Sequence, residues 1–209
     1  MPAEPTLDVE QEMFSSGIPL IIGIDEVGRG AMAGPVMVGV CALSPGVNSF
    51  PVGLRDSKLV SEKKRLALFP EVREWAPTAV GQASAAEIDE LGITACLGLA
   101  ARRALIELHD AGVLVGTATV LLDGSHNWLN PALASPLPVV TRVKADQDCA
   151  VVSAASIVAK VTRDQLMMEL DTTHPEYGWA SNKGYGAAVH MDAIKTVGIT
   201  PYHRASWVK

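Results

Sequence analysis

Residues 20–30 of this 209-residue chain read LIIGIDEVGRG, and this stretch is the most informative about the fold. Its first half, residues 20–24, is short, apolar and rich in β-branched residues, which is typical of a buried strand. Asp25 and Glu26 follow the strand directly, and a glycine-rich loop, residues 28–34, follows them. The end of this strand is therefore the first candidate functional site.

Apolar runs elsewhere in the chain predict the remaining elements. Further strands are expected at residues 36–43, 80–83, 119–122 and 139–143, and helices at residues 61–74, 93–109, 151–170 and 187–197. Ser84 and Glu87 form a capping box that opens another short helix. Strands mixed with helices predict an α/β domain with helices layered on a sheet, and we place it at residues 18–209. The polar segment 1–17 is expected to be loose.

Composition excludes several classes of protein. With 48% hydrophobic and 19% charged residues, the chain is globular rather than a disordered tail. The net charge of −6 argues against simple electrostatic binding of nucleic acid, unless carboxylates hold divalent metals. Prolines and glycines interrupt the uncharged stretch 31–54, and the first residues are acidic, so we expect no membrane span and no signal peptide.

The cysteines indicate a reduced compartment. Cys41, Cys96 and Cys149 are far apart and form no C-x-x-C pair, which excludes a zinc ribbon or a thioredoxin-type motif. Each is expected to be a small core residue. We therefore expect a cytoplasmic protein.

Carboxylates follow three separate strands. Asp25 and Glu26 follow LIIGI, Asp123 follows TVLL, and Asp146 follows VVTRVKA. If these strands lie in one sheet, the acids can converge at one edge, where they would suit hard ions such as Mg²⁺ or Mn²⁺. Two such ions about 3.5–4 Å apart are the usual clamp for displacement at phosphorus. Any one of these acids, taken alone, is also compatible with an ordinary strand-ending turn.

The glycine-rich loop is not interpreted as a dinucleotide site. Residues 28–33 match G-x-G-x-x-A, but Gly34, Pro35 and a β-branched run follow where that motif requires a helix. An adjacent acidic pair would also repel a pyrophosphate. The glycines instead let backbone N–H groups approach a ligand closely, with Arg29 adding a charge.

The helix at 151–170 carries a polar ribbon. Ser153, Ser156, Lys160 and Asp164 lie on one face of an otherwise apolar helix. This ribbon is expected either to face the acidic site or to reflect only a Lys160–Asp164 ion pair.

Several basic and aromatic residues lie in loops and are candidate substrate contacts. Lysine and arginine suit phosphate, and an exposed tyrosine can stack on a sugar or base. The candidates in loops are Lys58, Lys183, Tyr185 and Arg204, and Lys160 of the polar ribbon is a further candidate. Each could also be an ordinary surface or packing residue. His126, His190 and His203 have no zinc-ligand spacing and receive no role.

At GIDEVGRGAMAGPV the sequence closely resembles the ribonuclease HII family. The resemblance continues, in the family's order, through LRDSKLVSEKKR, IDELGI, VLLDGSHNWL, KADQDCAVVSAASIVAKVTRD, HPEYGWASNKGYG and HRASW. It implies a ribonuclease-H-like mixed sheet flanked by helices, with a small C-terminal helical part. Asp148 is a departure, because it adds a carboxylate near Asp146 where the family has no known metal ligand.

The resemblance also implies an activity. It indicates hydrolysis of the RNA strand of RNA–DNA hybrids and incision 5′ of single ribonucleotides in duplex DNA, leaving a 3′-hydroxyl and a 5′-phosphate. By motif match the metal ligands are Asp25, Glu26, Asp123 and Asp146, the 2′-hydroxyl sensor is Gly28, Arg29 and Gly30, and the sugar-stacking residue is Tyr185. We expect two Mg²⁺ or Mn²⁺ ions, no organic cofactor and a monomer.

Two other classes share parts of this pattern. A two-metal DNA resolvase or strand transferase would cut DNA that lacks any ribonucleotide. A catalytically silent hybrid-binding module would keep the fold, but it would be expected to lack a metal ligand. All four matching carboxylates are present here, so we favour the nuclease.

Overall fold

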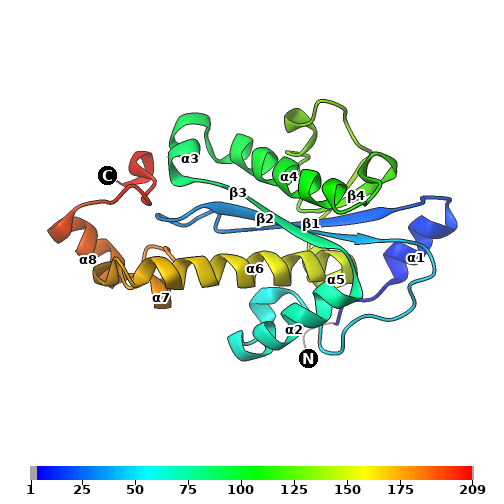
Figure 1. Cartoon of the computed structure of the whole chain (residues 1–209), viewed down its shortest axis with the longest axis horizontal. Coiled ribbons are helices and arrows are strands. Elements are labelled where there is room, and N and C mark those ends of the chain that lie inside the picture. Colours follow the sequence, from blue (N-terminus) through cyan, green and yellow to red (C-terminus); the bar gives the residue numbers. More distant parts are fainter. Residues whose placement is uncertain (1–3, 209) are drawn as a thin grey trace.

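The computed structural model describes residues 4–208 and contains a five-stranded mixed sheet between layers of helices (Figure 1). The strands are β1 (Ile21–Val27), β2 (Val36–Leu43), β3 (Thr78–Ala83), β4 (Thr119–Asp123) and β5 (Val139–Arg142). Their order is β3-β2-β1-β4-β5, in which β2 is antiparallel to both β3 and β1, while β1, β4 and β5 are mutually parallel. The expected α/β fold class is confirmed. Because β1, β4 and β5 are parallel, their carboxyl ends lie at the same edge.

One face of the sheet is covered by α3 (Ala85–Leu91) and α4 (Ile93–Asp110) (Figure 1). Side chains alternate along β1, so Ile22 and Ile24 pack toward this layer and Ile21 packs toward the opposite one. The capping box expected at Ser84 is present and begins α3. This alternation also decides on which face each acid of β1 lies.

The opposite face is covered by α6 (Ala150–Asp171), flanked by α2 (Glu62–Trp75) (Figure 1). Helix α6 runs so close to the sheet that a Cβ atom at Gly23 would lie 2.6 Å from the Val151 carbonyl oxygen. At Gly39 it would lie 2.3 Å from the Ala155 carbonyl oxygen. Small residues on both sides therefore fix the position of α6 over the strand that carries Asp25.

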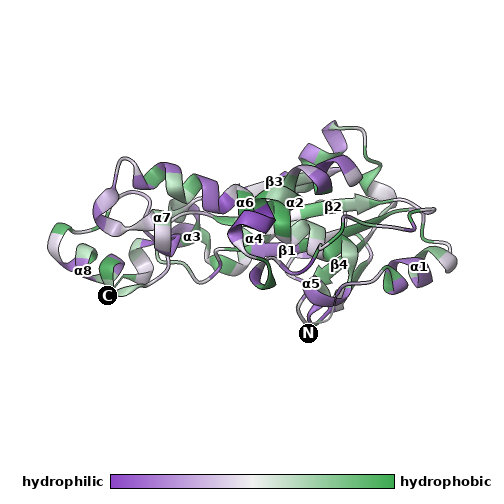
Figure 2. Cartoon of the chain, turned by 90° about the horizontal axis from the view of Figure 1, so that it is seen from below, coloured by the Kyte–Doolittle hydropathy of each residue, from purple (hydrophilic) through white to green (hydrophobic). Residues whose placement is uncertain are grey.

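The C-terminal helices form a small separate part at the far end of α6. They are α7 (Trp179–Asn182) and α8 (Ala188–Val197), and they enclose a core of their own that includes Met167, Tyr177 and Trp179. Figure 2 shows α8 and α1 at opposite ends of the molecule, with hydrophobic residues concentrated in the strands between them. The expected C-terminal helical part is thus present.

The N-terminal segment differs from the expectation of a loose chain. Residues 1–3 lie outside the described residues, but residues 8–15 form helix α1 (Asp8–Ser15). Leu7 and Glu10 are buried, and a Glu10 Oε1 atom accepts a hydrogen bond of 2.9 Å from the Val151 N–H at the start of α6. Glu10 contributes to the polar character of the segment, but it is buried because it caps α6. Local sequence patterns cannot predict a contact between residues so far apart in the sequence.

Strand β1 continues three residues beyond its expected end, to Val27, so Asp25 and Glu26 lie within the strand rather than after it. The other elements agree with the predictions to within two residues at each end, and the three cysteines are buried and unpaired as expected. Sequence reasoning missed α7 and the four-residue helix α5 (Ala145–Asp148) that precedes α6. Within residues 4–208, no helix is both long enough and apolar enough to cross a membrane.

Candidate metal and nucleic-acid site

Three aspartates converge at the shared edge of the parallel strands. Asp25 lies within β1, Asp123 is the last residue of β4, and Asp146 lies in α5 just beyond β5. Each has a carboxylate oxygen within 4.8 Å of those of the other two. The convergence predicted from strand ends is therefore present, although Asp146 arrives on a helix rather than directly on a strand end.

A left-handed residue brings Asp146 back to this edge. Lys144 has φ 63° and ψ 30°, a conformation that is uncommon outside glycine, and it reverses the chain after β5. The reversal lets the Ala145 N–H donate a 2.8 Å hydrogen bond to Asp123 Oδ1. The Ser153 hydroxyl on α6 then donates to the Asp146 carbonyl at 2.7 Å. The hydrogen bond from the Ala145 backbone thus holds the Asp123 carboxylate next to the residue that carries the Asp146 carboxylate.

Glu26 approaches from the other face of β1. Successive side chains on a strand point to opposite faces, so Glu26 is not part of the three-aspartate group around Asp25. It lines a pocket of about 440 Å³ together with Asp123, Arg29 and His126. Arg29 forms an ion pair with Glu26 at 3.4 Å. Asp123 is therefore the acid shared by both halves of the site.

Lys58 contributes a positive charge among these acids. Its Nζ lies 3.1 Å from Asp146 Oδ2 and 4.0 Å from Asp56 Oδ1. Burial lowers the pKa of Lys58, but Asp25, Asp56 and Asp146 together raise it by more, so its pKa lies above the usual range. Sequence reasoning singled out Lys58 but missed the buried Asp56, whose only signal was its place in the motif RDSKL.

The electrostatics of the acids suit a cation. Burial raises the pKa of Asp25 well above its usual range, and the neighbouring Glu26 and Asp146 raise it further against the effect of Lys58. Burial and then Asp146 raise the pKa of Asp123, and burial raises that of Glu26. Buried carboxylates that repel one another are stabilised by a hard divalent ion, and an all-oxygen donor set is what Mg²⁺ and Mn²⁺ prefer. The residues present therefore fit such ions.

The glycine-rich loop lies beside the acids and packs on two buried arginines, Arg163 and Arg204. Gly28 has φ +80°, and a Cβ atom there would lie 2.1 Å from the buried Arg163 Nε. Arg204 donates to the Gly28 carbonyl at 2.6 Å and to the Arg29 carbonyl at 2.8 Å. At Gly30, by contrast, a Cβ atom would meet no described atom within 4 Å, and the residue is exposed.

The segment that carries Tyr185 docks against the same loop. The Gly184 carbonyl accepts hydrogen bonds from the N–H groups of Met32 at 2.8 Å and Ala33 at 3.1 Å. Tyr185 is 39% exposed, and its ring lies 5.7 Å from the guanidinium carbon of Arg163. The structure thus brings together the glycine loop and the tyrosine, which are about 155 positions apart in the sequence.

The remaining candidates are in different situations. Lys160 donates to Asp164 at 2.7 Å, while Ser156 of the same helix face donates to the Ser57 hydroxyl at 2.8 Å. The ribbon therefore contains the Lys160–Asp164 ion pair but is not limited to it, because its Ser153 reaches Asp146 of the acidic site. The side chain of Lys183 donates to the Ala180 carbonyl.

Arg204 requires a correction. It is fully buried, so the expectation of a direct substrate contact is wrong, because its guanidinium binds backbone carbonyls under the loop. Asp148 pairs with Arg142 at 2.9 Å and, unlike Asp146, is not one of the three clustered aspartates.

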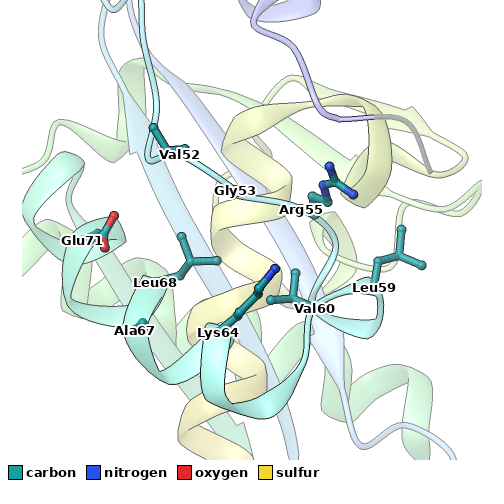
Figure 3. A pocket seen from close by; sticks show the side chains of 9 residues that line it. All are labelled: Val52, Gly53, Arg55, Leu59, Val60, Lys64, Ala67, Leu68 and Glu71. Atoms are coloured by element: carbon teal, nitrogen blue, oxygen red, sulfur yellow. The ribbon is translucent and has the colours of Figure 1, made fainter. Parts of the chain in front are cut away.

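A separate pocket of about 410 Å³ lies between the segment 52–60 and α2 (Figure 3). Arg55, Leu59 and Val60 line it from the segment that also carries Lys58, and Lys64 lines it from α2. None of the clustered aspartates lines this pocket, so it is distinct from the acidic site.

Known structures place this architecture in one class. The fold is similar to that of ribonuclease H2 from Pyrococcus horikoshii OT3, with a TM-score of 0.68 and 25% identity over 90% of this chain and 93% of that one. It is also similar to a ribonuclease HIII, named Bst-RNase HIII and solved in complex with Mn²⁺, with a TM-score of 0.71 and 23% identity over 91% and 68% of the two chains. The mixed sheet and its flanking helices thus have the ribonuclease H-type fold.

Sequence comparison is more specific. The family model for ribonuclease HII matches residues 22–209, and the chain belongs to this family. Ribonuclease HII of Streptomyces avermitilis is 48% identical over 99% of this chain and 85% of its own length. Ribonuclease HII of Cereibacter sphaeroides is 41% identical over 97% and 91%. The protein is therefore an endoribonuclease of the ribonuclease H type.

Proposed function

We propose that this ribonuclease hydrolyses the RNA strand of RNA–DNA hybrids and incises duplex DNA on the 5′ side of a single embedded ribonucleotide. The observation that carries the proposal is the pairing of two features at one edge of the sheet. Asp25, Asp123 and Asp146 form a cluster fit for divalent ions, and the exposed Gly30 loop lies beside Glu26 of the same strand. The first feature suits phosphodiester chemistry, and the second suits recognition of a small polar group.

The carboxylates act as metal ligands and not as nucleophiles. Asp25, Glu26, Asp123 and Asp146 would hold two ions, Mg²⁺ or Mn²⁺, which would supply the positive charge that activates water and stabilises the leaving 3′-oxygen. Lys58 lies among the same acids, and its positive charge there supports a contact with a phosphate oxygen. The products are a 3′-hydroxyl and a 5′-phosphate.

Recognition depends on the sugar and not on the base. The 2′-hydroxyl is both a donor and an acceptor, and it separates a ribonucleotide from a deoxyribonucleotide at any base. Backbone groups at Gly28, Arg29 and Gly30 contact it, and the exposed ring of Tyr185 stacks on the neighbouring sugar. Phosphate contacts carry no base information, so cleavage is independent of sequence. Lys160 and Lys183 are further candidates for phosphate contacts. The enzyme acts as a cytoplasmic monomer without an organic cofactor.

The substitution Asp25→Asn tests the ligand role. It keeps the shape of the side chain and removes its charge, so we expect cleavage of a labelled RNA–DNA hybrid to be almost abolished while binding of the hybrid is retained. Asp148→Asn is the matched control, because Asp148 is an acid close to the site in sequence that pairs with Arg142 instead. Near-normal cleavage by Asp25→Asn at saturating Mg²⁺ would contradict the proposal.

A further inference from the structure

The buried guanidinium of Arg204 binds the backbone of the glycine loop at several points. Nη2 donates to the Gly28 carbonyl at 2.6 Å, Nη1 donates to the Arg29 carbonyl at 2.8 Å, and Nε and Nη2 reach the Gly34 carbonyl at 3.3 and 3.2 Å. The ring of Trp207 lies 4.8 Å from the guanidinium carbon. A planar, forked donor can hold two successive carbonyls at once, which a lysine ammonium cannot do in the same geometry.

The direction of these carbonyls fixes the direction of two N–H groups. In a trans peptide the N–H points away from the C=O of the same unit, and the described residues contain no cis peptide. The Gly28 carbonyl shares its peptide with the Arg29 N–H, and the Arg29 carbonyl shares its peptide with the Gly30 N–H. Because both carbonyls point at Arg204, both N–H groups point away from it, toward the exposed side of the loop.

These two N–H groups are available to a ligand. Across residues 4–208 no backbone or side-chain atom accepts a hydrogen bond from the N–H of Arg29 or Gly30. Successive N–H groups that point the same way form a concave donor site for an anionic or lone-pair oxygen. Open space around Gly30 leaves room for that oxygen to approach.

Arg163 supports neighbouring parts of the loop but not these two peptides. It donates to the carbonyls of Pro35, Ala33 and Lys183 at 2.9, 3.0 and 2.8 Å. Burying two guanidinium groups close together is unfavourable unless each is fully paired, and burial followed by Arg163 lowers the pKa of Arg204 to about 10. Arg204 stays charged at neutral pH, and it binds the carbonyls of the two peptide units that carry the free N–H groups of Arg29 and Gly30.

We propose that Arg204 is a positioning residue for ribonucleotide recognition, because it orients the N–H groups of Arg29 and Gly30 toward the 2′-hydroxyl or the adjacent phosphate oxygen. The inference rests on the proposed function, since it assigns a recognition role to the same loop. It replaces the direct substrate contact first expected of Arg204.

Binding measured without turnover tests this role. Fluorescence anisotropy in Ca²⁺ gives the Kd for a duplex with one ribonucleotide and for the all-DNA duplex of the same sequence, and their ratio is the discrimination. We expect Arg204→Lys to reduce this ratio about tenfold, which corresponds to the loss of one or two hydrogen bonds, while the Kd for all-DNA changes little. Arg103→Lys is the matched control, because Arg103 also holds a backbone carbonyl, that of Gln82, on another element.

The outcomes separate the two claims. A purely structural role for Arg204 lowers the folded fraction and weakens both affinities alike, so an unchanged ratio would overturn the inference. An equal affinity of the wild-type protein for both duplexes would instead overturn the recognition role proposed for the loop.

A second measurement needs no variant at residue 204. In ¹⁵N-labelled wild-type protein, the amide resonances of Arg29 and Gly30 are expected to shift on adding the ribonucleotide duplex and much less on adding all-DNA. Shifts of equal size with both duplexes would contradict the inference even if Arg204→Lys fails to fold.

Discussion

Gly28 and Gly30 lie two positions apart in one loop, yet the fold requires only the first. Gly28 combines a φ of +80° with a clash between any Cβ atom and the guanidinium of Arg163. Gly30 shows neither strain nor crowding among the described residues. Packing among the described residues therefore does not require a glycine at position 30, whereas the proposed contact with a substrate would.

This contrast predicts that substitution by alanine affects stability at Gly28 and ligand binding at Gly30. Gly28→Ala should lower the free energy of unfolding by about 3 kcal/mol, because it adds left-handed strain and overpacking. Gly30→Ala should change stability by less than about 0.5 kcal/mol, yet weaken binding of a ribonucleotide duplex about tenfold. Urea unfolding and anisotropy measure both quantities. Unchanged binding by Gly30→Ala would show that no ligand approaches there.

At this scale the sequence predicted the clustering of the acids better than it predicted the residues that support the site. Asp25, Asp123 and Asp146 could be found because each follows an apolar strand, and strand order then decides that they meet. The burial of Arg204 could not be found, because a cation in a loop is usually exposed. Its partners are backbone carbonyls 170 or more positions away, and such contacts leave no local pattern.

Among the elements, α1 shows how a distant acid can cap a helix. Glu10 is buried at the start of α6, where Oε1 accepts the Val151 N–H and Oε2 has no hydrogen-bond partner among the described residues. Burial raises the pKa of Glu10, while the backbone hydrogen bonds oppose that shift. A raised pKa means that the folded state holds the proton more tightly than the unfolded state does.

The sign of the pH dependence follows from this shift. Stability contributed by Glu10 is largest below its unfolded pKa of 4.5 and is lost as pH rises through the folded value. Glu10→Gln keeps an acceptor for Val151 and cannot ionise, so it should be more stable than wild type at pH 8 and similar at pH 4. Chemical unfolding at both values measures this, with the exposed Glu12→Gln of the same helix as control. Equal stability losses at both pH values would contradict it.

A second pH effect belongs to the C-terminal helices. The Trp179 Nε1–H donates to His190 Nε2 at 3.1 Å, and His203 Nε2 lies 3.1 Å from the same nitrogen. His203 Nδ1 accepts the Thr200 N–H at 2.9 Å, so neutral His203 donates through Nε2. His190 Nδ1 lies 2.8 Å from the Tyr185 carbonyl and is its donor. In the neutral forms each ring nitrogen of His190 and His203 therefore acts as either a donor or an acceptor. A further proton on either ring removes its acceptor nitrogen.

We expect acid pH to destabilise the C-terminal helices before the rest of the fold. Burial, followed by the nearby His190, lowers the pKa of His203 to about 4 from 6.5. The unfolded state therefore takes up protons first, and stability is lost as pH falls from 6.5 toward 4. Unfolding free energies across this range should fall more steeply in wild type than in His203→Gln. The exposed His109→Gln should match wild type, and a wild-type slope in His203→Gln would contradict the assignment.

Element prediction succeeded where periodicity was strong and failed where tertiary contacts decide. The apolar strands and the long helices α4 and α6 followed from their patterns, because burial dictates both. The short helices α5 and α7 have four residues each and depend on left-handed residues, Lys144 and Gly178, at their starts. Only one of those two is a glycine, so the sequence carries little signal for them.

At the scale of the whole molecule, the site is assembled from segments that span the chain. Acids come from β1, β4 and α5, a lysine comes from the segment before α2, and the loop is supported from α6 and from the C-terminal part. The clustered acids and the glycine loop are thus held in place by different parts of the molecule. The acids rest on the sheet edge, and the glycine loop proposed for recognition contacts Arg163, Arg204 and the Gly184 segment.

The most direct test of this account is cleavage of a labelled DNA duplex that carries one ribonucleotide, beside an all-DNA duplex of the same sequence. Each is incubated with Mg²⁺, with Mn²⁺ and with a chelator. The account predicts a metal-dependent nick on the 5′ side of the ribonucleotide, and no cut in the all-DNA duplex. Cutting of the all-DNA duplex would indicate a resolvase-like activity instead, and binding without any cut would indicate a silent hybrid-binding module.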